Sequence, residues 1–151
     1  MDNFSAEMIA SLPNLKRYAI SLCRRADLAD DLVQITVERA FRARDSFDPA
    51  TRQLVWMMRI LRNAWIDMTR RQKTRGIEME LGDAPEVAGV DGARVVESRL
   101  MLQKTAQALD DLPTEQQEVL LTVCVHGMTY QEAADILGIP LGTVMSRLAR
   151  R

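Results

Sequence analysis

The sequence predicts an all-α protein of two small helical domains joined by a flexible linker, with a helix-turn-helix in the C-terminal domain. Three observations predict this fold. Apolar residues recur at helical spacing over long stretches of both halves of the chain. No segment alternates apolar and polar residues between hairpin signals, as a half-buried β-strand would. A glycine-containing acidic segment separates the halves, so we expect domains at residues 1–75 and 97–151 and a linker at 76–96.

The first helix that the pattern predicts runs from Asp27, as its N-cap, to about residue 44. Its apolar residues cover more than half of its circumference, so we expect the helix to be largely buried. A narrow polar stripe remains, formed by Asp31, Gln34, Glu38 and Arg42, with Asp30 at its edge. The charge pattern alone allows two interpretations of this stripe: a solvated face, or a docking surface for a basic or polar partner.

A second helix is predicted over residues 54–73. One side carries an apolar stripe that is typical of packing, formed by Leu54, Met58, Leu61, Trp65 and Met68. The opposite side carries a mixed polar face, formed by Arg59, Asn63, Asp67 and Arg70 and flanked by Arg62 and Arg71. Cations combined with an amide and a carboxylate can bind phosphate and also read base edges.

The loop between these helices, DSFDPATRQ at 45–53, is polar and is followed closely by Trp56. An aromatic or apolar pocket bordered by polar loop groups can hold an unstacked nucleic-acid base. Phe47 and Trp56 can equally belong to the core. On residue type alone we favour the core, because most aromatic side chains are packing residues.

The formal net charge of −1 conceals an alternation along the chain. Residues 59–75 carry six cations against Asp67 alone, a net charge of +5. Residues 77–97 carry six carboxylates against Arg94, a net charge of −5. Because local fields rather than the total charge govern phosphate attraction, the basic helix is compatible with nucleic-acid binding. The acidic segment shows neither helical nor strand periodicity, and we expect it to be extended or mobile.

The C-terminal domain is expected to contain four helices. The first ends before Pro113, which is disfavoured inside a helix. The second begins with a capping box of Thr114 and Gln117 and ends at Gly127. The last two form the helix-turn-helix, TYQEAADILGIPLGTVMSRLARR, at 129–151.

Three features define the helix-turn-helix. Thr129 and Glu132 form a capping box that opens its first helix. Gly138 supplies the unhindered backbone that a sharp helix exit needs. Pro140 cannot continue that helix but can open the next one.

The second helix of the pair has the pattern of a recognition helix. At about 100° per residue, Val144 and Leu148 fall on the inner side. The outer side consists of Thr143, Ser146, Ala149 and Arg150, flanked by Met145 and Arg147. Small hydroxyls and guanidinium groups suit a helix that lies in the major groove of DNA.

Composition and motifs argue against several classes of protein. The chain is 47% hydrophobic and 27% charged, has no apolar run of membrane-spanning length and lacks the start of a signal peptide, so we expect a cytoplasmic protein. Cys23 and Cys124 lie among apolar residues and are expected to be buried thiols. Cys124 and His126 supply only two of the three or four ligands of a tetrahedral metal site, so we expect no metal and no cofactor. No P-loop, nucleophile elbow or acid–base pair indicates an enzyme.

The chain resembles the extracytoplasmic function (ECF) sigma factors, the minimal two-domain type of bacterial transcription initiation factor. The resemblance is carried by DLADDLVQITVERAF at 27–41, LVWMMRILRNAWIDMTRRQ at 54–72, LDDLPTEQQEVLLT at 109–122 and the C-terminal helix-turn-helix. It implies a stress-responsive factor without enzyme activity, which binds core RNA polymerase, directs it to specific promoters and helps to melt promoter DNA. The partners it implies are core RNA polymerase, promoter DNA and an anti-sigma factor.

The resemblance also assigns roles to residues, with sigma region two at 1–75 and sigma region four at 97–151. The surface for core polymerase is Asp30, Asp31, Gln34 and Glu38. The surface for the minus-ten element is Arg59, Arg62, Asn63, Asp67, Arg70 and Arg71, with the loop at 46–53 expected to hold a flipped base. The surface for the minus-thirty-five element is Gly142, Thr143, Ser146, Arg147 and Arg150. Met145 and Ala149 stand where many relatives carry arginine or a bulky side chain, which we expect to alter minus-thirty-five preference.

Two other functions compete with the one that this resemblance implies. A stand-alone helix-turn-helix repressor or activator would bind duplex operators without polymerase, and it leaves the basic helix and the acidic stripe without a role. A nucleic-acid-processing enzyme would need a catalytic constellation that the sequence does not contain. Association with core RNA polymerase distinguishes the sigma factor from the first of these.

Overall fold

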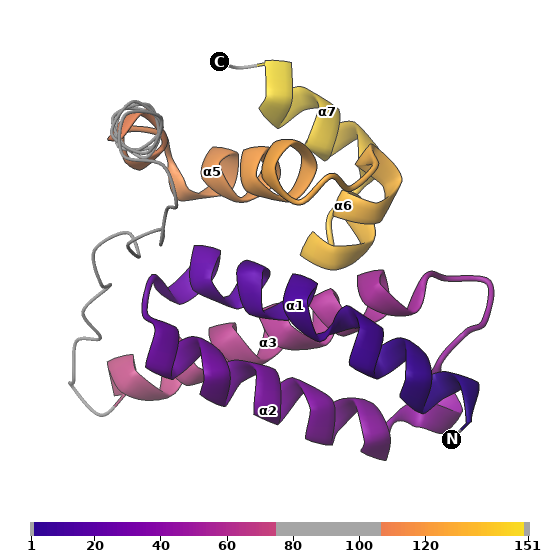
Figure 1. Cartoon of the computed structure of the whole chain (residues 1–151). Coiled ribbons are helices and arrows are strands. Elements are labelled where there is room, and N and C mark those ends of the chain that lie inside the picture. Colours follow the sequence, from indigo (N-terminus) through magenta and orange to yellow (C-terminus); the bar gives the residue numbers. More distant parts are fainter. Residues whose placement is uncertain (1, 75–106, 150–151) are drawn as a thin grey trace, which may run out of the picture.

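The computed structural model describes residues 2–74 and 107–149, and every regular element within these ranges is helical. The N-terminal domain contains α1 (Asn3–Cys23), α2 (Ala26–Arg42), the short 3-10 helix η1 (Arg44–Ser46) and α3 (Gln53–Thr74). The C-terminal domain contains α5 (Thr114–Leu120), the π-helical turn η2 (Leu121–Val125), α6 (Tyr130–Leu137) and α7 (Leu141–Ala149) (Figure 1). The predicted all-α class is confirmed. The predicted linker at 76–96 and most of the helix predicted to follow it lie outside the described residues.

The N-terminal domain is a bundle in which α1, α2 and α3 pack against one another in all three pairs. Its largest fully buried side chains are Leu15, Tyr18, Leu32, Met57, Met58 and Leu61. Burial of each such leucine or methionine stabilises the bundle by about 1.5–3 kcal/mol. Two residues of the predicted packing stripe, Met58 and Leu61, are therefore at the centre of the core.

Helix α1 was not expected from the sequence. The Asp2 carboxylate caps its N-terminus by accepting a hydrogen bond from the Ser5 N–H at 2.8 Å. Pro13 lies inside the helix, where proline usually indicates a break. The helix ends at Arg24, which takes a left-handed conformation with φ of 58° and donates its N–H to the Ile20 carbonyl. An internal proline and an arginine where glycine is usual conceal this helix in the sequence.

Two predicted helix starts are wrong. Asp27 does not cap α2, because its carboxylate pairs with the Arg25 guanidinium at 2.7 Å, a hydrogen bond that lowers the pKa of Asp27. Thr114 makes no capping bond at the start of α5. The amide of Gln117, its predicted partner, donates instead to the Leu112 carbonyl at 2.8 Å.

The turn chemistry predicted for the helix-turn-helix is confirmed. Thr129 accepts the Glu132 N–H on its hydroxyl at 3.1 Å, and the Glu132 carboxylate accepts the Thr129 N–H at 2.9 Å. Gly138 ends α6 with φ of 66°, and Gly127 follows η2 with φ of 69°. Both conformations disfavour side chains that carry a Cβ, which explains the two glycines.

The two cysteines differ in their surroundings. Cys23 is buried as predicted, and burial raises the pKa of its thiol. Cys124 is exposed, so the prediction of a second buried thiol is wrong. Across residues 2–74 and 107–149, no cluster of three or more potential metal ligands is present. None of the helices described in these ranges is both long and apolar enough to cross a bilayer.

The two domains pack against each other in the structure. Helix α6 packs on α3, and the residue that follows η2 reaches α1. Helix α2 lies on the side of the bundle that faces away from the C-terminal domain (Figure 1). Among residues 2–74 and 107–149, the bundle therefore has one face covered by the second domain and one face that no other described element covers.

The capping box gives a first testable prediction. We expect Thr129→Ala to lower the free energy of unfolding of the C-terminal domain by roughly 1 kcal/mol, because the Glu132 N–H loses its partner. Urea denaturation followed by circular dichroism measures this change. Thr114→Ala is the matched control, since that threonine also begins a helix but caps nothing. Equal losses of stability in the two variants would contradict the assignment.

Candidate nucleic-acid interface

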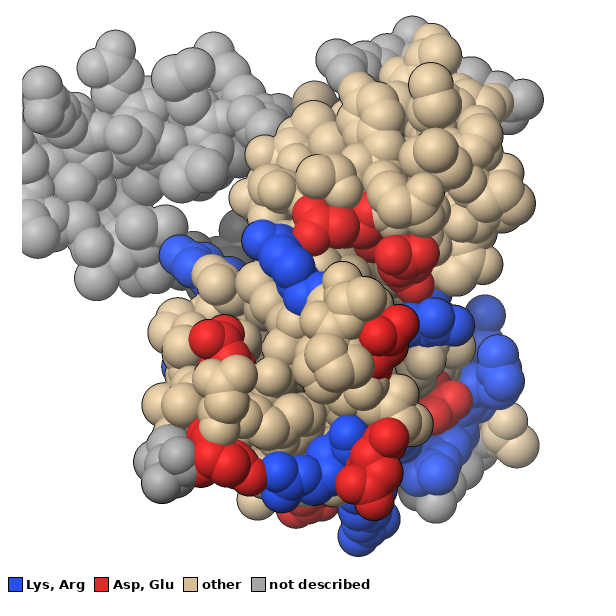
Figure 2. Space-filling model, turned by 90° about the vertical axis from the view of Figure 1, so that its right-hand side faces the viewer, with Lys and Arg blue, Asp and Glu red and all other residues tan. Residues whose placement is uncertain are grey.

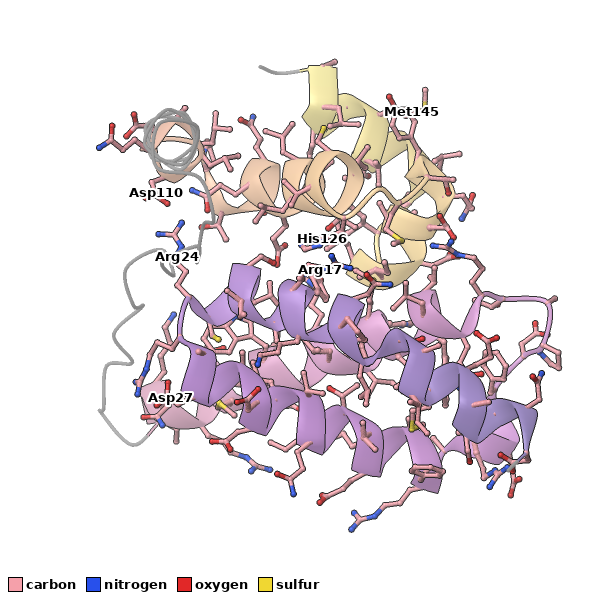
Figure 3. All side chains as sticks on the ribbon, viewed as in Figure 1. Arg17, Arg24, Asp27, Asp110, His126 and Met145 are labelled. Atoms are coloured by element: carbon pink, nitrogen blue, oxygen red, sulfur yellow. The ribbon has the colours of Figure 1, made fainter. Side chains whose placement is uncertain are left out.

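Helix α7 is held by an apolar side and exposes a side of small residues. Val144 and Leu148 are buried against α5 and α6, as the helical spacing predicts. Gly142 and Ser146 are exposed, and Thr143 is half-buried. Met145 is 52% exposed and points away from the protein (Figure 3). Within the described residues of α7, the exposed surface therefore consists of small neutral groups and two apolar side chains, Leu141 and Met145.

Arg147 is less available than its sequence position suggests. Its guanidinium lies 3.6 Å from the Glu115 carboxylate of α5, and its side chain is only 22% exposed. It is the one cation within α7 as the structure describes that helix. Arg150, the other predicted cation of the recognition helix, lies outside the described residues.

The predicted polar face of α3 is largely open to solvent. Arg59, Asn63, Arg70 and Arg71 are exposed. Asp67 is half-buried and pairs with Arg39 of α2 at 3.2 Å, so it holds α3 to α2. Asp67, Arg70, Arg71 and Thr74 together line an open pocket near the C-terminal end of the helix. This end of α3 offers an anion two guanidinium groups that form no ion pair with any described residue, beside a carboxylate that Arg39 already neutralises.

Arg62 is separated from that face. Its guanidinium makes two bonds to the Glu118 carboxylate of α5, at 3.1 and 3.2 Å, and a third to the Leu137 carbonyl of α6 at 3.4 Å. Only 16% of its side chain is exposed. In the packed arrangement Arg62 therefore joins the two domains and does not face solvent with its neighbour Asn63.

The polar stripe of α2 is exposed along its length, at Asp30, Asp31, Gln34 and Glu38. Asp30 pairs with Lys16 of α1 at 3.3 Å, and both side chains are more than half exposed. Asp31 and Glu38 form no ion pair with any residue that the structure describes. The stripe thus presents uncompensated negative charge on the open side of the bundle.

Phe47 and Trp56 take part in an aromatic cluster with Phe4 and Phe41. The Phe47 and Trp56 ring centroids lie 5.0 Å apart, and Phe4 makes edge contacts with the other three rings at 5.9–6.0 Å. This cluster agrees with the prediction, from residue type alone, that Phe47 and Trp56 are packing residues. A groove next to it is lined by α1 and by the loop that contains Phe47 and Pro49, so an apolar edge bordered by polar loop groups is also present.

The contact between the domains was not expected from the sequence. His126, which follows η2, lies 3.0 Å through its Nε2 from the Ser21 hydroxyl of α1, and its ring packs edge-on against Tyr18 at 5.1 Å. Ser21 donates its hydroxyl hydrogen to the Tyr18 carbonyl, which leaves its oxygen to accept from Nε2–H of a neutral ring. Burial and the nearby Arg17 lower the pKa of His126, in agreement with a neutral ring (Figure 3).

Both domains match known families. The N-terminal domain matches Sigma-70 region 2 over residues 8–75, and the C-terminal domain matches Sigma-70, region 4 over residues 102–150. The chain is 36% identical over 149 residues to the ECF RNA polymerase sigma factor EcfG of Rhodopseudomonas palustris, covering 99% of this chain and 81% of the relative. It is 31% identical over 140 residues to the RNA polymerase sigma factor HrpL of Pseudomonas syringae, covering 90% and 76%.

Two solved structures are similar over almost the whole chain. The sigma factor RpoE of Bartonella quintana, in complex with the anti-sigma factor NepR, has a TM-score of 0.76 at 31% identity and covers 99% of this chain and 92% of its own. CnrH in complex with the cytosolic domain of CnrY has a TM-score of 0.68 at 27% identity and covers 97% and 80%. The two domain matches, the coverage of the relatives and the shared fold show that this chain belongs to the ECF family of RNA polymerase sigma factors, which are transcription initiation factors and not enzymes.

Proposed function

We propose that this sigma factor uses three separate helix faces, one for core RNA polymerase and two for promoter DNA. The observation that carries the proposal is that the three predicted residue sets lie on three different helices, α2, α3 and α7, each with exposed members. We assign region two to residues 1–75, the linker to 76–96 and region four to 97–151. The protein works in the cytoplasm, where core polymerase is found.

The α2 stripe is the surface we assign to core polymerase. Its carboxylates are exposed, and Asp31 and Glu38 are uncompensated among the described residues. A basic partner surface would gain complementary charge there, which favours rapid and specific association. Because α2 faces away from the C-terminal domain, the stripe is accessible while the domains are packed (Figure 1).

The open face of α3 is the surface we assign to the minus-ten element. Arg59, Arg70 and Arg71 supply charge for phosphates, and the Asn63 amide supplies donors and an acceptor for base edges. Asp67 positions α3 against α2 through Arg39. The groove beside Phe47 is where we expect an unstacked base to bind.

Helix α7 is the surface we assign to the minus-thirty-five element. Gly142 lets the backbone approach phosphate, and Thr143 and Ser146 can bond bases or phosphates. The Arg147 guanidinium pairs with the Glu115 carboxylate within the protein, and the exposed Met145 adds an apolar contact. Arg150, which the sequence places on the same side of the helix, supplies a further cation, and an apolar side chain can contact the thymine methyl group.

We infer the regulation of this chain from the related structures. The Bartonella RpoE and CnrH structures contain the anti-sigma factor NepR and the cytosolic domain of CnrY, respectively. We propose that an anti-sigma factor likewise controls this chain and that a stress signal releases it. The same protein would then be inactive until it is released to polymerase.

The polymerase surface gives the second prediction. We expect Asp31→Lys combined with Glu38→Lys to weaken association with core polymerase at least about tenfold, or ~1.4 kcal/mol, because two attractive charges become repulsive. Co-elution and a fluorescence titration with core polymerase measure it, and circular dichroism must show unchanged helicity.

The matched control reverses two exposed carboxylates elsewhere in the same bundle, Glu7→Lys with Asp45→Lys. It should bind polymerase like the wild type. Equal weakening in both double variants would mean that net charge, and not the α2 stripe, determines association.

The minus-ten face gives the third prediction and tests the function itself. Core polymerase with this protein should make run-off transcripts from its own promoters, and Asn63→Ala with Arg70→Ala should lower the yield about tenfold or more, since each specific base or phosphate contact contributes roughly 1–3 kcal/mol. Polymerase association should be unchanged. Arg17→Ala, which removes an exposed arginine from α1, is the control and should transcribe normally. Stable operator binding without polymerase association would refute the sigma-factor assignment.

A further inference from the structure

The described ion pairs between the two domains all have the same polarity, with the cation on the bundle. Arg24 pairs with Asp110, Arg52 with Glu132 at 2.7 Å, and Arg62 with Glu118 at 3.1 Å. In each of these pairs the arginine belongs to the helical bundle and the carboxylate to the C-terminal domain. Figure 2 shows acidic side chains along the edge of the C-terminal domain facing basic side chains of the bundle.

The central pair is also the least exposed. The side chains of Arg62 and Glu118 are 16% and 23% exposed, and the two bonds between them form a bidentate contact. This is the geometry with which an arginine binds phosphate. The Leu137 carbonyl accepts a further bond from the same guanidinium. The C-terminal domain thus satisfies Arg62 with oxygen atoms alone.

The second pair lies at the loop beside the aromatic cluster. Arg52 belongs to that loop, and its guanidinium contacts the Glu132 carboxylate of α6 as well as the Met128 sulfur at 3.4 Å. Glu132 uses its other oxygen in the capping box of α6, so its carboxylate is held rigidly in place. Arg62, from the predicted minus-ten set, and Arg52, from the loop expected to hold a flipped base, are therefore both bound by carboxylates that the C-terminal domain positions.

We propose that the C-terminal domain acts as an intramolecular mimic of the promoter phosphates: Glu118 and Glu132 occupy Arg62 and Arg52, and nucleic acid binds the bundle fully only when the domains separate. The inference rests on the promoter surfaces proposed above and adds their regulation. Carboxylates and phosphate diesters offer a guanidinium the same kind of anionic oxygen pair, so they compete for it. The free chain then has low affinity for nucleic acid, while its α2 stripe stays available to polymerase.

Neutral isosteres test this competition. Glu118→Gln combined with Glu132→Gln removes both charges with little change of shape, and glutamine at position 132 can still complete the capping box. The control is Asp111→Asn with Asp135→Asn, which changes net charge equally in the same domain at exposed carboxylates that pair with no described cation of the bundle. The fourth prediction compares the full-length chains in two measurements. One is the radius of gyration from small-angle X-ray scattering, and the other is affinity for a labelled mixed-sequence single-stranded DNA of roughly 20 nucleotides at low salt.

We expect the E118Q/E132Q chain to expand and to bind the strand roughly fivefold or more tightly than the wild type, and the control to stay compact and within about twofold in affinity. Equal gains in both variants would show a simple charge effect and would overturn the proposal. A chain that stays compact, or that expands without binding more tightly, would also overturn it. The promoter assignment is tested separately, because transcription by the Asn63→Ala and Arg70→Ala variant does not involve the interdomain pairs.

Discussion

The guanidinium of Arg62 is the group on which the arrangement of the two domains depends. From one position on α3 it bonds the Glu118 carboxylate of α5 and the Leu137 carbonyl of α6, so a single side chain fixes two helices of the second domain. Little of it is exposed, and leaving either partner of such a pair alone is costly. Around it, Ser21 and Tyr18 bind a neutral His126, and Arg24 and Arg52 add pairs at the edges of the contact.

This contact divides the molecule into a covered face and an open face. The covered face contains Arg62, one of the residues predicted for the minus-ten element, whereas the α2 stripe proposed for polymerase is on the other side (Figure 1). A chain in this state can meet polymerase before DNA. The order has a physical advantage, because cations that stay paired inside the protein do not attract the large excess of nonspecific DNA in a cell.

The sequence predicted best those elements whose signals are local. The period of α3 and the capping box and glycine of the helix-turn-helix need only neighbouring residues, and the structure confirms them. Helix α1 was missed because Pro13 and Arg24 contradict local rules that the packing of the bundle overrides. The N-cap expected at Asp27 failed because its own carboxylate pairs with Arg25, and in the capping box expected at Thr114 the Gln117 amide bonds the Leu112 carbonyl instead.

The same contrast between local signals and long-range contacts applies to the candidate site. Sequence spacing placed Arg59, Asn63 and Arg70 together on an exposed face, but it could not show that Arg62, one residue before Asn63, turns toward another domain. Its partner is 56 residues away along the chain, and no local pattern encodes such a pair. The exposure of Cys124 escaped notice for the same reason, since it depends on which side of η2 meets the core.

Charge exchange across the Arg62–Glu118 pair tests most directly whether this contact holds the domains together. The measurement is the radius of gyration of the free chain by small-angle X-ray scattering for Arg62→Glu, for Glu118→Arg and for both changes combined. If the pair holds the domains together, each single variant expands, because two like charges then face each other, and the double variant returns to the compactness of the wild type. Single variants as compact as the wild type, or a double variant as expanded as the singles, would contradict the central role of this ion pair.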